Sequence, residues 1–336
     1  MRLALGLDGG GTKAACLLAD ERGRVLGYGL GGPTNVNFVA RRTAAASVRQ
    51  AVRKALARAD LPRVEIAVAR ASHAGPDWAA AARSVAPVGD AREIGEHDPV
   101  RAACMGDGPG VVIIAGTGAT AIGWDRRGRQ IGVGGWGSPL GDEGGAYETA
   151  LHAIRAAIHG EDGRGEPTAL GRAVCEHFKI ARLGELPRLF YRERVPRHVV
   201  SGLCPRVVEA AQEGDAVARK VLAGSGQALG LAAGAAIRRL RLGRSRVEVV
   251  VAGGLSRVGP LLMGPLRREV RRAAPRAEVK AASREPVVGC LLLAVSCVAG
   301  RSTAAGVDER LRAAVDASME ALGLLGWPGP ERKPDG

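Results

Sequence analysis

The sequence has 336 residues, which is enough for two domains that each bury a hydrophobic core. Hydrophobic residues make up 46% and charged residues 24%, a balance that excludes a wholly disordered chain and a collagen-like repeat. The net charge is +14, but 42 of the 48 basic residues are Arg beside abundant Ala and Gly, so the charge reflects coding composition as much as chemistry. Because only ten aromatic residues could stack on bases, we expect no nucleic-acid partner.

Cysteine usage and hydropathy predict a cytoplasmic protein without a membrane partner. The N-terminal apolar run is broken at Asp8, too early for a signal peptide, and the longest apolar stretch, residues 287–299, is too short to span a bilayer. There is no C-x-x-C pair and no His cluster beside a cysteine, as a zinc site would need. We expect reduced, mostly buried thiols at Cys16, Cys104, Cys175, Cys204, Cys290 and Cys297.

The first half of the chain opens with three predicted strands. An apolar run at residues 3–7 leads into the glycine-rich loop 8–12, a second run ends at residue 19, and a third follows the turn 20–23. This third strand spans residues 25–30. Helices at 40–59, 78–85 and 99–105 and a strand at 64–68 are predicted for the rest of this half.

The second half repeats this opening. The run 111–115 leads into a Gly-Thr-Gly hairpin at 116–118, and a turn at 125–128 precedes a strand at 131–133. From Thr12 and from Thr117 alike, the turn Asp lies 8 residues on and the turn Gly 11 residues on, which indicates a duplicated β-meander. Further helices are predicted at 142–158, 199–212, 215–240, 258–272, 286–298 and 307–324, with strands at 247–251 and 277–280.

Glycines and a proline at residues 106–110 mark a domain boundary just before the second meander. We therefore predict an α/β protein with an N-terminal domain at residues 1–108 and a C-terminal domain at residues 109–326. Residues 327–336, rich in Pro and charge, are expected to form a frayed tail.

The loop that begins at Asp8 has the composition of a phosphate cradle. Three glycines let the backbone turn its N–H groups toward an anion, while Thr12 and Lys13 add a hydroxyl donor and a charge. It is neither a P-loop nor a dinucleotide fingerprint, because a strand follows where both need a helix. The alternative is a plain glycine hairpin. We predict nucleotide binding by Gly10, Gly11, Thr12 and Lys13, with Asp8 holding Mg²⁺ through water.

Later glycine sites extend this prediction. The hairpin 116–118 is weak evidence alone, but as the second copy of the meander we expect it to face one cleft with the first hairpin and to grip the same polyphosphate. Residues 253–254 follow a strand and open a helix, where phosphates could lie, although a tight connection explains them as well. Gly214 could border the adenine or form an interhelical turn. The predicted contacts are Gly116, Thr117, Gly118, Gly214, Gly253 and Gly254.

Phosphoryl transfer to a hydroxyl needs a carboxylate that orients the hydroxyl and accepts its proton. Asp98 is the candidate, just before a predicted helix. Asp followed by Pro99 is equally the pattern of a helix N-cap with Pro at the first position. Asp107 competes for the role, but its Gly-Asp-Gly-Pro-Gly setting favours an outer turn.

The loop 132–145 is too glycine-rich for a helix or strand and could close over a ligand. Trp136 could stack on a sugar while Asp142 binds its hydroxyls; alternatively, Trp136 belongs to the core and Asp142 caps the next helix. Asn35 could bind a sugar or cap a helix, and His73 could touch the substrate or be a solvated loop residue. The predicted substrate contacts are Asn35, Ser72, Trp136, Gly137, Asp142 and Glu143.

Taken together, these motifs resemble the BadF/BadG/BcrA/BcrD ATPase family, most closely its N-acetylglucosamine kinase branch. The resemblance covers about residues 3–300 and lies in the order of the motifs, of which Gly-Trp-Gly and Gly-Asp-Glu-Gly are the most distinctive. The motifs occupy residues 8–13, 115–118, 134–137, 141–144, 213–215 and 252–254.

The resemblance implies the two-domain actin-like ATPase (ribonuclease H-like) fold of sugar kinases, with ATP and Mg²⁺ as cofactors. We also expect the chain to form a homodimer. The resemblance implies Asp98 as catalytic base, Asn35, Trp136 and Asp142 at the sugar, and Thr12, Thr117, Gly214 and Gly253 at the nucleotide. The chain departs from the family pattern at three places: Ala119 replaces a frequent Ser, Pro99 replaces the usual Ala, and residues 69–72 replace a more glycine-rich loop.

The expected activity is transfer of the ATP γ-phosphoryl group to a hydroxyl of an amino sugar such as N-acetylglucosamine or glucosamine. One alternative is an ATP-hydrolysing activator of a dehydratase or reductase, which would hold an iron–sulfur cluster through paired cysteines; here Cys290 and Cys297 look packed on an apolar helix. Another alternative is a non-catalytic sugar sensor, which the lack of an evident helix-turn-helix extension makes less favoured.

Overall fold

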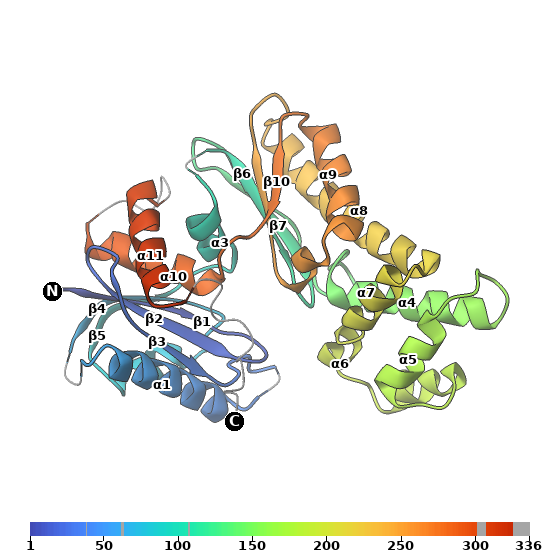
Figure 1. The fold of residues 1–336 in the computed structure, drawn as a ribbon, viewed down its shortest axis with the longest axis horizontal. Helices are drawn as coiled ribbons and strands as arrows, with labels where there is room; N and C mark the ends of the chain where they lie inside the picture. Colours follow the sequence, from blue (N-terminus) through green and yellow to red (C-terminus); the bar gives the residue numbers. More distant parts are fainter. Residues whose placement is uncertain (38, 62–63, 107, 301–306, 325–336) are drawn as a thin grey trace. The chain divides into compact units, whose positions relative to one another are not determined.

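The computed structural model describes residues 1–324 except 38, 62–63, 107 and 301–306, and these form two compact units (Figure 1). Unit 1 comprises Met1–Asp107 and Ala282–Gly336, and unit 2 comprises Gly108–Ala281. Each unit is described by itself.

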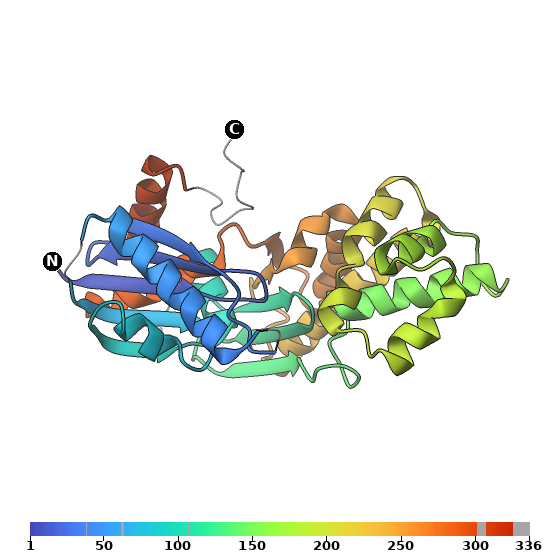
Figure 2. The same ribbon diagram turned by 90° about the horizontal axis from the view of Figure 1, so that it is seen from below.

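Unit 1 contains a five-stranded sheet in the order β3-β2-β1-β4-β5. The strands β1 (Leu3–Asp8), β2 (Ala14–Asp20) and β3 (Val25–Gly31) form an antiparallel meander, and β4 (Ile66–Ser72) and β5 (Val88–Glu93) add parallel strands beside β1. One face is covered by α1 (Arg41–Arg58) and α2 (Trp78–Arg83), and the other by α10 (Pro286–Val298) and α11 (Glu309–Ala321) (Figures 1 and 2). The short helix α3 (His97–Cys104) packs against α10.

Glycines on alternate positions of β3 allow α1 to lie directly on the strand. A β-carbon at Gly27, Gly29 or Gly31 would lie 2.0 Å from a carbonyl oxygen of α1. Successive alternate residues of a strand point to the same face, so this one face of β3 can carry no larger side chain.

Unit 2 contains a second five-stranded sheet, in the order β10-β9-β6-β7-β8. Its meander is β6 (Gly110–Ala115), β7 (Ala119–Trp124) and β8 (Gln130–Gly134), and the parallel strands are β9 (Glu248–Ala252) and β10 (Glu278–Ala281). The helical segments are α4 (Ala146–Glu161), α5 (Leu170–Phe178), η1 (Leu183–Glu185), η2 (Arg188–Arg192), α6 (Arg197–Ser201), α7 (Cys204–Gln212), α8 (Ala216–Arg239), η3 (Gly254–Val258) and α9 (Pro260–Ala273).

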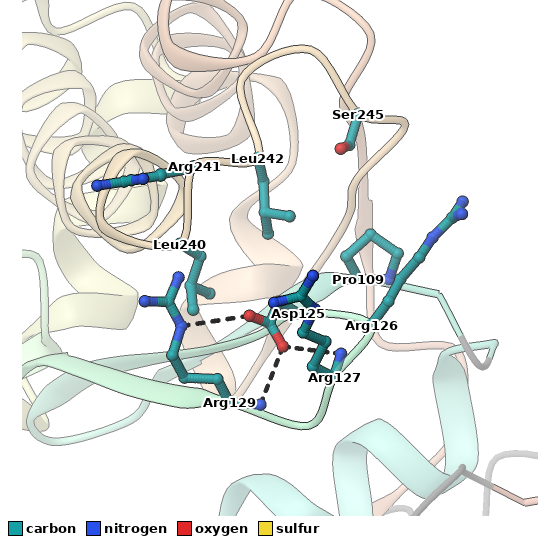
Figure 3. Close-up of a pocket in the computed structure, with 9 residues that line it drawn as sticks. All are labelled: Pro109, Asp125, Arg126, Arg127, Arg129, Leu240, Arg241, Leu242 and Ser245. Carbon is teal, nitrogen blue, oxygen red and sulfur yellow. Dashed lines mark hydrogen bonds and ion pairs between the residues drawn. The ribbon is translucent and has the colours of Figure 1, made fainter.

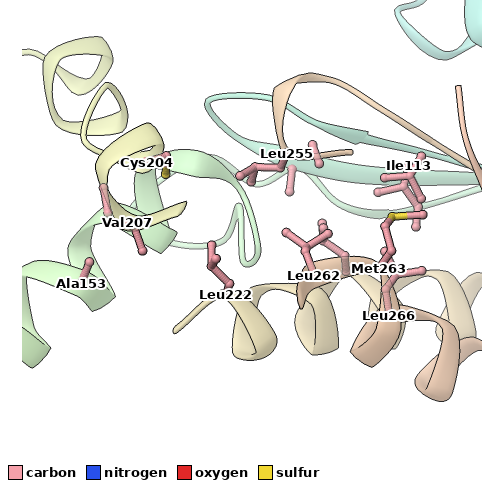
Figure 4. Packing of buried hydrophobic residues seen from close by; sticks show 14 of the residues in the cluster. Ile113, Ala153, Cys204, Val207, Leu222, Leu255, Leu262, Met263 and Leu266 are labelled. Carbon is pink, nitrogen blue, oxygen red and sulfur yellow. The ribbon is translucent and has the colours of Figure 1, made fainter. Parts of the chain in front are cut away.

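The core of unit 2 joins the sheet to these helices. Ile113 of β6 lies over Met263 and Leu266 of α9, all at most 3% exposed, while Leu222 of α8 extends the cluster toward α4 and α7 (Figure 4). Because these residues come from distant parts of the sequence, the core depends on packing that no single segment specifies.

Both sheets share one topology, a meander followed by two parallel strands on the side of its first strand. This confirms the predicted α/β fold with a duplicated β-meander. The strand β5 was not among the predicted strands, because the sequence of this sheet edge carries Asp90, Arg92 and Glu93 without an apolar alternation.

The division of the chain differs from the predicted C-terminal domain, residues 109–326. The chain returns to unit 1 at Ala282, and α10 packs on β1 so closely that a β-carbon at Gly6 would lie 2.3 Å from the backbone nitrogen of Leu291. The physical reason is that α10 is apolar nearly all round and covers a sheet face that would otherwise be exposed. The predicted tail 327–336 lies outside the described residues.

Among the described residues, no helix is long and apolar enough to cross a bilayer.

Candidate active site

The carboxyl ends of β1 and β4 bring polar groups together in unit 1. Asp8, the last residue of β1, lies opposite Ser72, the last residue of β4. Burial raises the pKa of Asp8 to about 7, with Glu285 raising it further and His73 and Lys13 opposing the shift. A carboxylate that is poorly compensated at neutral pH is suited to binding a cation. No cluster of three or more metal-ligating side chains occurs among the described residues.

Hydrogen bonds through Thr34, a residue that belongs to none of the sequence motifs, join the first glycine loop to the end of β4. The buried Thr34 hydroxyl accepts from the Gly10 N–H at 3.0 Å and donates to the His73 carbonyl at 2.9 Å, while the Gly9 N–H donates to the Ser72 carbonyl at 2.8 Å. A β-carbon at Gly9 would lie 2.1 Å from that hydroxyl. Gly11 and Thr12 stay exposed at the tip, where their polar groups are accessible to an anion.

Asp98 lies in the first turn of α3. The N-cap residue is Glu96, so the N-cap alternative for Asp98 is wrong. Its Oδ2 accepts from the Gly95 N–H at 3.2 Å, and its Oδ1 has no hydrogen-bond partner among the described residues. The N-terminal end of a helix stabilises a carboxylate in this position, and the Oδ1 atom can still accept a hydrogen bond from another group.

The N-terminal half of α10 packs against both β1 and α3. Cys290 is fully buried in that half, and burial raises the pKa of its thiol, with Asp8 and then Asp98 among the smaller contributions. A β-carbon at Gly289 would lie 1.8 Å from the Pro99 carbonyl oxygen, so α10 and α3 are in backbone contact here. Sequence order alone does not bring residues 8, 98 and 290 into one neighbourhood; the packing of α10 does.

His73 is partnered rather than freely solvated. Its Nε2 lies 3.2 Å from a Glu96 carboxylate oxygen, and its Nδ1 lies 3.4 Å from the Ser72 hydroxyl. The hydrogen bond to Glu96 raises the pKa of His73. The backbone of His73 is left-handed, with φ of 51°, and the neighbouring Ser72 is only 1% exposed.

Asn35 forms a local turn. Its Oδ1 accepts from the Asn37 N–H at 2.9 Å, and the N-cap of α1 is Ala40 instead. The helix-cap alternative for Asn35 is therefore wrong, and its amide nitrogen has no hydrogen-bond partner among the described residues.

In unit 2, the Gly-Thr-Gly hairpin rests on the N-terminus of α4. The Ala146 and Tyr147 N–H groups donate to the Gly116 and Thr117 carbonyls at 2.8 and 3.0 Å. The first two N–H groups of α4 therefore hold the hairpin, and the Thr117 side chain is left exposed.

Asp142 lies beneath this hairpin. A β-carbon at Gly118 would lie 2.6 Å from its Oδ2, so only glycine fits there. Asp142 Oδ2 accepts from the Arg197 guanidinium at 2.9 Å, and its Oδ1 accepts from the Ala119 N–H at 3.4 Å. It does not cap α4, whose N-cap is Gly145. Arg197, more than fifty residues away in sequence, had no signal that could have revealed it.

Trp136 is 77% exposed, so its assignment to the core is wrong. It lines a pocket of about 410 Å³ with Glu143 and apolar residues of α8 and the sheet, among them Leu229 and Leu231. Gly137, next to Trp136, has a positive φ of 74°.

The remaining glycines occupy connections. Gly214 is exposed with φ of 108°, just before Asp215, whose carboxylate caps α8 by accepting from the Ala218 N–H at 2.8 Å. Gly253 has φ of 96°, and its β-carbon would lie 2.4 Å from the Ala115 carbonyl oxygen. Gly253 is the N-cap of the 3₁₀ segment η3, which Gly254 opens, and the α-helix α9 begins at Pro260. The helix that opens at this site is therefore a short 3₁₀ segment and not the predicted long helix.

All six cysteines are free thiols, and four of them are buried, which confirms the expectation for this set.

The model of the BadF/BadG/BcrA/BcrD ATPase family matches residues 5–294. An N-acetylmuramic acid/N-acetylglucosamine kinase of Clostridium acetobutylicum is 25% identical over 303 residues, covering 88% of this chain and 99% of the relative. An N-acetyl-D-glucosamine kinase of Dictyostelium discoideum is 25% identical over 310 residues, covering 87% of this chain and 97% of the relative.

Two solved structures show the same fold. A candidate N-acetylglucosamine kinase from Chromobacterium violaceum has a TM-score of 0.67 at 24% identity, over 87% of this chain and 99% of that one. A ROK family glucokinase from Streptomyces griseus, solved with glucose and AMPPNP, has a TM-score of 0.55 at 20% identity. The match covers 87% of this chain and 99% of that one. The predicted actin-like ATPase fold of sugar kinases is thereby confirmed.

Proposed function

Because the chain belongs to the BadF/BadG/BcrA/BcrD ATPase family, we propose that it is an ATP-dependent kinase of an amino sugar such as N-acetylglucosamine or glucosamine. Its curated relatives are named kinases of N-acetylmuramic acid and N-acetylglucosamine, of N-acetyl-D-glucosamine, and of glucosamine. The observation that carries the proposal is that α10 packs against both β1, which ends at Asp8, and α3, which has Asp98 in its first turn.

In the proposed reaction, Asp98 orients the acceptor hydroxyl and takes its proton as the γ-phosphoryl group arrives. Its Oδ1 is available for that proton, since Gly95 occupies only Oδ2. Asp8 would hold Mg²⁺ through water, and the ion would neutralise charge on the phosphates. Phosphate contacts are assigned to Gly10, Gly11, Thr12, Lys13, Gly116, Thr117 and Gly118, and other nucleotide contacts to Gly214, Gly253 and Gly254.

The sugar contacts are proposed at Asn35, Ser72, Trp136, Gly137, Asp142 and Glu143. The side-chain nitrogen of Asn35, which has no hydrogen-bond partner among the described residues, and the exposed ring of Trp136 suit a sugar. Asp142 already has two partners within unit 2, so its proposed role includes holding the hairpin 116–118. That both glycine–threonine hairpins grip one triphosphate stays a prediction.

The test of this function is the Asp98→Asn variant. We expect sugar phosphorylation to fall by about 10²–10⁴-fold while the Kd for ATP is kept, because the amide orients a hydroxyl but does not accept its proton. Asp77→Asn is the matched control, since Asp77 is a carboxylate of the same unit whose ion pair joins it to Arg41. Phosphorylation by folded Asp98→Asn protein at the parental rate would refute the assignment.

A panel of acceptors identifies the substrate. ATP consumption is measured with glucosamine, N-acetylglucosamine, N-acetylmuramate, N-acetylmannosamine and glucose, and we expect an amino sugar to give the highest kcat/KM. Consumption independent of every sugar would favour the activator, and sugar binding without consumption would favour a sensor.

We also propose a homodimer in the cytoplasm, to be checked by light scattering during size-exclusion chromatography and by fractionation of cells.

A further inference from the structure

A second pocket, of about 470 Å³, lies where the β7–β8 turn meets the end of α8 in unit 2 (Figure 3). None of the residues proposed for ATP or sugar lines it. Its lining is Pro109, Asp125, Arg126, Arg127, Arg129, Leu240, Arg241, Leu242 and Ser245.

The duplicated meander supplies an internal comparison for this turn. In unit 1, Asp20 Oδ1 accepts from the backbone N–H groups of Arg22 and Arg24 at 3.0 and 2.9 Å. In unit 2, Asp125 Oδ1 accepts from the N–H groups two and four residues on, both at 2.9 Å. In each copy the arginine four residues after the Asp pairs with its other carboxylate oxygen, at 3.5 Å in unit 1 and 3.2 Å in unit 2. The turn itself therefore needs only the Asp and that one arginine.

The surroundings of the two turns differ. In unit 1 the turn is covered by α11: a β-carbon at Gly23 would lie 2.7 Å from Leu311, and the Val25 N–H donates to the Ser318 hydroxyl. In unit 2 a β-carbon at Gly128 would meet no atom within 4 Å among the described residues, and the turn borders the pocket. The position that a helix fills in one copy is open in the other.

Three arginines of this pocket have no role in the fold that the structure records. Arg126 and Arg127 come from the turn and Arg241 from the residue after the helix C-cap, and all three are exposed (Figure 3). Among the described residues, none of their guanidinium groups has a hydrogen-bond or ion-pair partner. Asp125 is the one carboxylate in the lining, and Arg129 and the backbone already hold it. The pocket therefore has an uncompensated positive charge.

The floor of the pocket is apolar. Leu240 and Leu242 are 3% and 7% exposed, and Pro109 lies beside them. Guanidinium groups bind phosphate through paired, charge-assisted hydrogen bonds, whereas an apolar floor suits a carbon skeleton. Arginines around an apolar floor therefore suit a small molecule that has a phosphate group and an apolar carbon skeleton.

We propose that this pocket is a separate binding site for a small phosphorylated metabolite, whose carbon skeleton lies against Leu240 and Leu242. Its phosphate is held by Arg127, and by Arg126 and Arg241 once they turn inward from the outward positions that they have in Figure 3. The proposal does not depend on kinase activity, since these residues are apart from the proposed catalytic set.

The experiment is titration calorimetry on the full chain with inorganic phosphate, glucosamine 6-phosphate and AMP as probes. We expect R126Q/R127Q/R241Q to weaken binding of at least one organic phosphate about tenfold or more, because each lost charge-assisted hydrogen bond lowers affinity by at least that factor. The preference between glucosamine 6-phosphate and AMP identifies the skeleton as sugar or nucleoside. R155Q/R268Q/R276Q is the control, since it removes the same charge from exposed arginines of unit 2 outside the pocket.

Unchanged binding by R126Q/R127Q/R241Q, or equal weakening by the control, would overturn the proposal. It would also fail if a single-stranded oligonucleotide bound more tightly than either organic phosphate and lost that binding in the same variant, because the surface would then be for a polymer. Circular-dichroism melts that match the parent show that each variant is folded. If the triple variant is not folded, binding of the organic phosphates is measured with the single variant R126Q instead.

Discussion

At the scale of single residues, the glycines in the proposed nucleotide loops are of two kinds. Gly253 has a positive φ and a backbone neighbour at 2.4 Å from its would-be β-carbon, whereas Gly254 beside it has open space. Only the first is required by geometry, although both belong to the same motif.

We therefore expect Gly253→Ala to lower the free energy of unfolding by about 1–3 kcal/mol and to weaken ATP binding, because the strained alanine must displace the Ala115 backbone. Gly254→Ala is the control and should change stability by less than about 1 kcal/mol. Thermal melts and ATP titrations check both. An equal loss of stability and of ATP binding in the two variants would show that the positive φ and the close contact at Gly253 do not cause the loss.

His73 and Glu96 form a second residue-scale feature, because their ion pair links the β4 end to the start of α3. The pKa of His73 is raised and that of Glu96 is lowered, each mainly by the other. The stability from the raised His73 pKa is complete below its unfolded value and is lost as pH rises through the folded value. The stability from the lowered Glu96 pKa is complete above the pKa of Glu96 in the unfolded chain, and it is lost as pH falls through the pKa in the folded protein.

His73→Gln should accordingly destabilise the protein most at mildly acidic pH, between the two folded pKa values, and least in alkaline solution. The side chain of His73 is 52% exposed, so solvent screening keeps the loss below about 1 kcal/mol. Denaturant unfolding at a series of pH values measures it, with His152→Gln, at an exposed position on α4, as the control. A loss that does not vary with pH would show that the ion pair is not its cause.

At the scale of elements, the contact between α10 and α3 decides where the proposed base lies. The Pro99 carbonyl occupies the space of a Gly289 side chain, and Asp98 precedes Pro99 directly. Any side chain at position 289 must therefore move one helix against the other.

Gly289→Ala should cost about 1–3 kcal/mol of stability through overpacking and should lower kcat by displacing Asp98. Gly224→Ala is a matched control, since it is also a helical glycine but has no atom within 4 Å of its β-carbon; it should be neutral or stabilising by up to about 1 kcal/mol. Chemical denaturation and initial rates test the pair. If Gly289→Ala melted and turned over like the parent, α10 would not position the base.

At the scale of the whole molecule, unit 1 is assembled from both ends of the chain, whereas unit 2 is one continuous segment. The face of the first sheet beneath α10 carries buried apolar residues such as Leu17 and Ala4. Without residues from Ala282 onward, that face has no cover.

A chain ending at Ala281 should therefore keep a folded unit 2 while unit 1 is lost. Limited proteolysis with mass spectrometry should find a resistant fragment near residues 108–281, and amides of β1 and β4 should exchange rapidly with solvent. The full chain is the control. Persistent protection of β1 in the shortened chain would mean that α10 is not needed to hold that sheet.

The sequence by itself determined the duplicated β-meander, because apolar periodicity, glycine–threonine loops and D-x-x-G turns are local signals that recur at one spacing. The positions of Asp8 and Asp98 at element ends were likewise readable from their neighbours. Only the tertiary structure decided that α10 returns to unit 1, that it packs against both β1 and α3, and that Arg197 holds Asp142. These contacts join segments that are far apart in the chain. Tertiary packing determines them, and local sequence patterns do not predict them.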